Sequence, residues 1–180
     1  MTELLDYITE GIIARIKALR RYYGLPKISK SFAFADDSIA LLSIGTYEEM
    51  ILPCHKKLIT SLSDGSEPNS IHLCGDASRF FPLLVKKLHI STFDTGFPID
   101  HGAIVRELGP DITIYGGVHV ETLRSGSPEA IDKNVRSILT AVKPYTRRFI
   151  IKEANNLSPG TPPENITAMH EAVKKYGYYQ

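Results

Sequence analysis

Apolar residues at the start of the chain recur every three or four positions. Over residues 2–23 they fall on one side of a helix, with charged residues between them, which predicts an amphipathic helix. Gly24 and Pro26 end that pattern. We therefore expect residues 1–24 to form an amino-terminal helix ahead of the rest of the domain. Its apolar positions are Leu4, Ile8, Ile12, Ile16 and Leu19.

From residue 31 onward, short apolar runs alternate with amphipathic segments. The runs predict five strands, at residues 31–35, 70–74, 90–93, 111–115 and 149–152. The amphipathic segments predict helices, at residues 46–61, 77–87, 101–108, 127–142 and 161–176. Because no Asn-Gly hairpin signal joins two strands, we expect parallel strands in βα units. The fold class is therefore α/β, with residues 31–180 forming five βα units of a single domain.

The predicted helices begin at recognisable capping signals. Residues 46–49 and 161–164 have the capping-box pattern, in which a threonine is followed three positions later by a glutamate. Asp76 and Ser127 are the predicted caps of two further helices. We expect each of these side chains to accept a hydrogen bond from the first turn of its helix.

Five βα units suit either a doubly wound sheet or part of a closed barrel. A (β/α)8 barrel needs eight strands and about 250 residues, so this sequence is about three strands short of one. No Gly-x-Gly-x-x-Gly follows the first strand, and no phosphate-loop lysine pattern occurs. The nucleotide-binding use of a doubly wound sheet therefore has no support in the sequence.

Composition and charge exclude several classes of function. The chain has 43% hydrophobic and 23% charged residues, which is typical of a folded domain. Its net charge of +1 provides no field for gathering nucleic acid or anionic lipid. The longest uncharged stretches, at residues 38–47 and 154–163, are half of the roughly 20 residues that span a bilayer. Acidic residues follow Met1 in place of a secretory signal, so we expect a cytoplasmic protein.

Polar residues gather at, or just beyond, the carboxyl ends of the predicted strands. Parallel α/β sheets place their active sites at this edge, so we expect a shared pocket for a small-molecule substrate there. Simpler explanations stay open, because an acidic pair also caps helices and a Gly-Gly pair also forms tight turns. The residues concerned are Asp36, Asp37, His72, Cys74, Asp94, Gly116, Gly117, His119, Glu153, Asn155 and Asn156.

The sharpest of these signals is His72 followed two residues later by Cys74. Residues i and i+2 of a strand point the same way, so an imidazole and a thiolate can converge on one ion. This donor pair suits zinc, although a zinc site requires two further ligands. A buried cysteine beside a hydrogen-bonded histidine is the alternative. We expect Cys54 in the core. Three histidines in helices or at a helix end, His55, His89 and His170, are expected on the surface.

Taken in order, the motifs resemble the uroporphyrinogen decarboxylase superfamily, which includes methyltransferases that serve corrinoid proteins. The resemblance covers nearly the whole chain and is carried by residues 35–38, 52–53, 72–75, 94–98, 115–117 and 158–165. It implies a (β/α)8 barrel, of which this sequence matches only the carboxyl-terminal part, the last five strands.

In the methyltransferase branch, the resemblance implies a zinc ion that activates a thiol for methyl transfer. There, a His-x-Cys and a second cysteine after the last strand bind the ion, but Asn155 stands at that second position here. Glu153, Asp36 or Asp37 would substitute for the cysteine, or the metal has been lost. A corrinoid protein is then the expected partner. Our favoured assignment places Asp36, Asp37, Glu153 and Asn155 in catalysis, and Asp94, Gly116, Gly117, His119 and Asn156 in substrate binding.

Two alternatives stay open beside the methyltransferase-like function. One is a decarboxylase-type lyase of porphyrin biosynthesis, which needs no cofactor. Its branch uses an arginine and an aspartate near the amino terminus, in a region that this sequence does not match. The other alternative is a partial barrel without catalysis of its own, which binds a partner chain or a small ligand.

Assembly is the last expectation from the sequence. Five strands of a partial barrel leave two open sheet edges and an inner face, expected to be apolar, that the missing strands would otherwise cover. A helix at residues 2–23 shields only one side of such a sheet. We therefore expect a homodimer or a complex with a partner chain.

Overall fold

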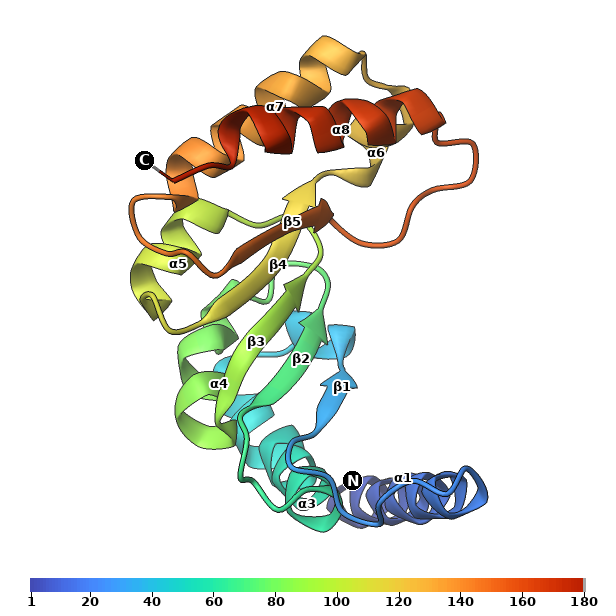
Figure 1. Cartoon of the computed structure of the whole chain (residues 1–180). Coiled ribbons are helices and arrows are strands. Elements are labelled where there is room, and N and C mark those ends of the chain that lie inside the picture. Colours follow the sequence, from blue (N-terminus) through green and yellow to red (C-terminus); the bar gives the residue numbers. More distant parts are fainter. Residues whose placement is uncertain (180) are drawn as a thin grey trace.

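The computed structural model of the chain describes residues 1–179 and contains one parallel sheet. Its strands are β1 (Ala33–Ala35), β2 (Asn69–Leu73), β3 (Ile90–Thr95), β4 (Thr113–Val118) and β5 (Phe149–Glu153). They lie in sequence order, β1-β2-β3-β4-β5, and every neighbouring pair is parallel. The predicted α/β class is confirmed. Within the described residues, no further strand pairs with the outer edge of β1 or of β5, so both edges of the sheet are open (Figure 1).

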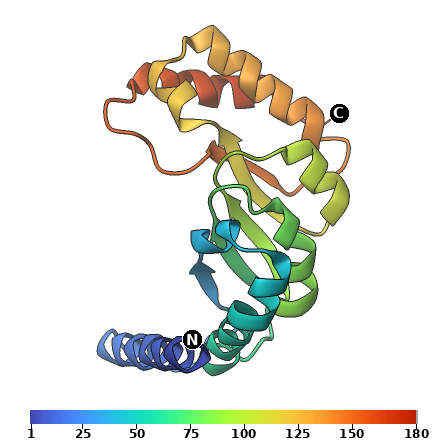
Figure 2. The same ribbon diagram turned by 180° about the vertical axis from the view of Figure 1, so that it is seen from behind.

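Helices cover one face of this sheet and both of its ends. They are α1 (Thr2–Tyr22), α2 (Ile44–Thr46), α3 (Leu52–Leu62), α4 (Phe81–Leu88), α5 (His101–Leu108), α6 (Val120–Ser125), α7 (Pro128–Val142) and α8 (Pro163–Tyr176). Seen from behind, α4 and α5 lie on the near side of the sheet, and α3 lies below the strands next to α1 (Figure 2). The α7–α8 pair lies at the β5 end and α1 at the opposite end (Figure 1).

Alternate strand residues build the core between the sheet and its helices. Ile71 on β2, Phe93 on β3 and Ile114 on β4 are each at most 2% exposed. Phe93 stacks on Phe81 of α4 with the ring centroids 4.3 Å apart. Burying each such side chain contributes roughly 1.5–3 kcal/mol. A second apolar cluster joins β4 to α6, α7 and α8 through Val118, Leu123, Ile131, Val135, Leu139, Met169 and Ala172.

The opposite face of the sheet is open, and it combines the apolar surface that the sequence predicts, including Ala33 and Phe34, with polar side chains. On β2 and β3 the residues that alternate with the core carry small or polar groups, among them Ser70, His72, Thr92 and Asp94. Together with Tyr115 they line a cleft of about 320 Å³. Alternation along β2 directs Ile71 and Leu73 toward the core and leaves Ser70 and His72 on the open face.

Several predicted boundaries also shift. The helix expected at residue 46 begins earlier, because Ser43, not Thr46, accepts the capping hydrogen bond, and a π-helical turn at Tyr47–Ile51 follows. Thr161 donates to the Ser158 carbonyl and does not cap α8. Asp76 accepts a hydrogen bond from the Ser78 hydroxyl and does not cap a helix backbone. Ser127 caps α7 as predicted.

Helix α1 matches the predicted helix, but most of the apolar side chains along its predicted apolar face are exposed to solvent. Only Thr9 and Ile13 are buried, whereas Leu4 is 56% exposed and Ile8 is 46% exposed. Side-chain pairs tie it to α3, where Lys57 lies 2.6 Å from Asp6. None of the helices within residues 1–179 is both long enough and apolar enough to cross a membrane.

We predict that the open edges and the exposed apolar side chains of α1 make the purified protein associate, with itself or with a partner chain. Unpaired strand edges and exposed apolar side chains favour association. Light scattering at micromolar concentration checks this. A stable species at the chain mass of 20.0 kDa, with no binding of a hydrophobic dye, would contradict it.

Candidate functional site

Three side chains of different chemistry meet at the carboxyl ends of β1 and β2. They are Asp37, His72 and Cys74, whose ligand atoms all lie within 4.8 Å of one another. His72 comes from β2 and Cys74 directly follows that strand. Asp37 opens the 3-10 turn η1 (Asp37–Leu41) after β1. The parallel pairing of Ala35 with His72 brings the two strand ends together.

The spacing of these atoms suits a tetrahedral metal. His72 Nε2 lies 3.5 Å from Cys74 Sγ and 3.7 Å from Asp37 Oδ1. Ligands at zinc bond lengths of about 2.0–2.3 Å, arranged tetrahedrally, are separated by about 3.3–3.8 Å. Sulfur, imidazole and carboxylate are all zinc donors. The two separations from His72 and the three donor types therefore fit such an ion.

The second nitrogen of His72 is held by a carboxylate. His72 Nδ1 lies 3.0 Å from Asp94 Oδ2, and the other oxygen of Asp94 accepts a hydrogen bond from Lys152 at 2.9 Å. A carboxylate behind a histidine fixes the ring and the tautomer, so that the opposite nitrogen is the one that binds a metal. Glu153 lies 3.9 Å from Lys152 Nζ, at the end of this network.

The electrostatics of Cys74 depend on a cation. Its burial, and then the carboxylates of Asp37 and Asp94, raise the pKa of the thiol, while Lys152 lowers it. Without a further positive charge, Cys74 is therefore a neutral thiol at physiological pH. A bound divalent ion reverses the sign of this local field, because a coordinating thiol is deprotonated.

The other sequence-predicted residues lie around this cluster or away from it. Asp36 turns toward α3, where its Oδ2 lies 3.1 Å from His55 Nε2. Asn155 is half-buried and Asn156 is exposed, both in the bend after β5. His119 caps α6 by accepting a hydrogen bond from the Glu121 amide.

Gly116 and Gly117 lie inside β4 and not in a turn beyond it, which corrects the predicted strand end. Both pair with β5. A Cβ on Gly116 would come within 2.4 Å of His101 Nε2, and one on Gly117 within 1.9 Å of the Lys152 carbonyl oxygen. Glycine is required here by close packing within the protein itself.

A family model described as Uroporphyrinogen decarboxylase (URO-D) matches residues 1–176. The chain belongs to the URO-D family. It is 30% identical over 173 residues to the methylated-thiol–coenzyme M methyltransferase of Methanosarcina mazei, covering 95% of this chain and 43% of that protein. It is 23% identical over 138 residues to the uroporphyrinogen decarboxylase of Dechloromonas aromatica, covering 75% of this chain and 38% of that protein.

A solved methyltransferase structure from Methanosarcina mazei shares the fold of this URO-D family chain. The TM-score is 0.71 at 18% sequence identity, over 98% of this chain and 50% of the other. The chain thus spans less than half the length of the two curated relatives and half of the solved structure. The expected partial barrel is confirmed at this level of the fold.

Sequence reasoning missed two residues of the site of this URO-D family chain. His55 was expected on the surface but is only 5% exposed. Its spacing to Leu58, Ile59 and Leu62 is that of one buried helix face, a signal that could have placed it inside. The sequence predicts Lys152 only as the end of a strand, because a single sequence does not show which carboxylate a lysine reaches.

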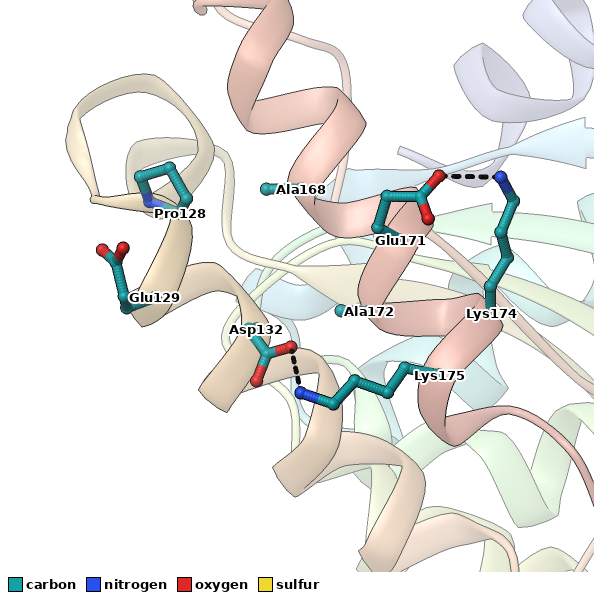
Figure 3. A pocket seen from close by; sticks show the side chains of 8 residues that line it. All are labelled: Pro128, Glu129, Asp132, Ala168, Glu171, Ala172, Lys174 and Lys175. Atoms are coloured by element: carbon teal, nitrogen blue, oxygen red, sulfur yellow. Dashed lines mark hydrogen bonds and ion pairs between the residues drawn. The ribbon is translucent and has the colours of Figure 1, made fainter.

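A surface groove lies elsewhere, between α7 and α8. It has a volume of about 740 Å³, and Figure 3 shows its lining side chains. Two ion pairs border it, Glu171 with Lys174 at 2.7 Å and Asp132 with Lys175 at 3.5 Å. None of the sequence-predicted site residues lines it, so it stands apart from the candidate site. The full lining is Pro128, Glu129, Asp132, Ala168, Glu171, Ala172, Lys174 and Lys175.

We predict that His101 makes the fold acid-sensitive. Burial lowers the pKa of this histidine from 6.5 to about 4, and among the described residues its Nε2 has no hydrogen-bond partner. Because the unfolded chain takes up the proton first, the free energy of unfolding falls as the pH drops from about 6.5 to about 4, by up to about 3 kcal/mol. Urea unfolding of the wild type and of His101→Gln at several pH values measures this. Equal pH slopes for both proteins would refute the assignment.

Proposed function

We propose that this chain carries the metal site of a URO-D family methyltransferase and takes part in methyl transfer to or from a thiol. The cluster of Asp37, His72 and Cys74 supports this proposal most strongly, because it unites sulfur, nitrogen and oxygen donors at the active edge of the sheet. The relative from Methanosarcina mazei, whose name describes methyl transfer from a methylated thiol, adds to it.

In this proposal Asp37 takes the position that the resemblance gives to a second cysteine. The sequence left Asp36 as an equal alternative for this ligand position, but its carboxylate is hydrogen-bonded to His55. Glu153 lies next to Lys152 and is not part of the three-residue cluster. Asp37 alone of the three reaches both the His72 ring and the Cys74 backbone, at 3.7 Å and 2.7 Å.

The chain's own residues prepare the site for a thiol. A zinc ion bound here would lower the pKa of a substrate thiol and hold it as the nucleophilic thiolate. Asp94 holds His72 in the orientation that leaves Nε2 toward the cluster, and Lys152 balances the charge of Asp94. The cleft beside His72 and Asp94, about 320 Å³ in volume, offers space for a small substrate on the open face.

A corrinoid protein is the proposed partner in this transfer. The methyl group would pass between the cobalt of the partner's corrinoid and the sulfur of the thiol. Because the chain spans less than half of its curated relatives, transfer from the corrinoid protein requires the part of the barrel that this sequence does not contain, whereas activation of a small thiol requires only the three-residue cluster. The decarboxylase alternative gives the three-residue cluster no role, since that chemistry needs no cofactor.

A methylcobalamin assay tests the proposal. The thiolate of 2-mercaptoethanesulfonate attacks the methyl carbon, the cobalt–carbon bond breaks, and its electron pair leaves with cobalt as cob(I)alamin, which absorbs distinctively. We expect zinc-loaded protein to form the methyl thioether, His72→Ala to lose that activity, and the matched control His170→Ala to keep it. Equal rates for wild type and His72→Ala, or turnover of uroporphyrinogen in their place, would refute the methyltransferase proposal.

A further inference from the structure

Two consecutive carboxylates after β1 serve different neighbours. Asp37 Oδ1 accepts a hydrogen bond from the Cys74 amide at 2.7 Å. Asp36 points the other way, with Oδ2 against His55 Nε2 at 3.1 Å and Oδ1 accepting from the Ser38 amide at 3.2 Å. Both oxygens of Asp36 are therefore engaged, which leaves the turn that presents Asp37 little freedom.

The group that holds Asp36 is itself buried and hydrogen-bonded. His55 is 5% exposed, and its Nδ1 lies 3.1 Å from the hydroxyl of Tyr47, which is fully buried. Burial and the nearby Asp36 raise the pKa of Tyr47, so its hydroxyl keeps its proton. The hydrogen bonds then run in one direction. Tyr47 donates to His55 Nδ1, and His55 Nε2–H donates to Asp36.

Packing fixes both rings of this network. Phe34 lies edge-on to His55 with the ring centroids 4.8 Å apart, and Phe80 lies edge-on to Tyr47 at 5.3 Å. Tyr47 also opens the π-helical turn that leads into α3, a distortion often found near functional sites. A buried polar network is costly unless every member is paired. Apolar side chains would fill the same core at lower cost, so the network that ends at Asp36 points to a role other than packing.

We infer that Tyr47 and His55 form a positioning relay. By fixing Asp36 they hold the adjacent Asp37 against Cys74 and His72. The role of the relay in metal binding rests on the proposed function, whereas its role in placing Asp37 does not. His55 is thus a positioning residue that acts through Asp36 and touches neither the substrate nor an ion.

Amide hydrogen exchange of the metal-free protein tests the placement directly. The Cys74 amide reports on Asp37, because that carboxylate is its hydrogen-bond acceptor. We expect His55→Leu to speed its exchange at least tenfold, while the Ile114 amide in β4 keeps its rate. His55→Gln, which retains a side-chain donor for Asp36, should restore most of the protection. Asp36→Ala removes the same contact from the Asp36 side, so its Cys74 amide should exchange as fast as in His55→Leu. Unchanged Cys74 protection in Asp36→Ala would overturn the inference, even if His55→Leu does not fold.

Cobalt binding to the same variants separates this inference from the proposed function. We expect His55→Leu to weaken Co²⁺ binding roughly tenfold, as loss of a supporting residue around a metal site typically does. In an Asp36→Ala background, the His55 substitution should have no further effect. Faster Cys74 exchange without Co²⁺ binding to the wild type would uphold the relay and refute the metal site. Unchanged Cys74 exchange in the variants, together with Co²⁺ binding to the wild type, would uphold the metal site and refute the relay.

Discussion

Replacing Cys74 with serine is expected to weaken zinc binding by roughly 100-fold or more, because it removes the only sulfur donor of the cluster. A serine hydroxyl is a hard donor with a high pKa, so it does not replace a thiolate at neutral pH. With Co²⁺ as the probe, the sulfur-to-metal charge-transfer band should disappear as well. Calorimetry and absorption spectra measure the two effects.

Cys54→Ser is the matched control for this substitution. Cys54 lies in α3, where its thiol donates to the Met50 carbonyl at 3.5 Å, and it is not part of the cluster. Its replacement should leave both the affinity and the charge-transfer band unchanged. If Cys54→Ser rather than Cys74→Ser removed the band, the metal would lie elsewhere in the chain.

The second large effect is on stability. Gly117→Ala should lower the free energy of unfolding by about 3 kcal/mol or more, since overpacking against a backbone that cannot move is among the costliest single changes. The added Cβ would lie 1.9 Å from the Lys152 carbonyl oxygen, inside the pairing of β4 with β5. Separating the strands would also move Lys152 away from Asp94, so His72 would lose part of its support.

Urea unfolding compares this variant with a glycine in open space. Gly11 lies on an exposed position of α1, with nothing within 4 Å of its missing Cβ. Gly11→Ala should therefore stabilise the protein by about 0.5–1 kcal/mol through helix propensity. A Gly117→Ala protein as stable as the wild type would show that β4 and β5 do not pair as described.

The order of elements was predictable because it depends on local patterns. Periodic apolar positions and turn residues located the five strands and their helices, and parallel alternation placed His72 and Cys74 at the same edge as Asp37. The end of β4 was misplaced because Gly116 and Gly117 resemble a turn. Only the partner strand β5 shows that they pair as strand residues.

The details of the site depend on contacts between distant segments, which a single sequence does not show. The sequence does not distinguish Asp36 from Asp37. The turn between β1 and η1 directs Asp36 to His55 and Asp37 to the cluster. The same holds for Lys152, whose Asp94 partner lies 58 positions away in the chain. Charge and donor type were predictable, but the pairing was not.

The zinc affinities of Asp37→Ala and Asn155→Ala, measured side by side, test the central claim most directly. The cluster of Asp37, His72 and Cys74 predicts that Asp37→Ala weakens zinc binding roughly 10- to 100-fold. It also predicts that Asn155→Ala, at the position where the resemblance places a second cysteine, binds zinc like the wild type. Unchanged affinity in Asp37→Ala together with a loss in Asn155→Ala would contradict this account of the site.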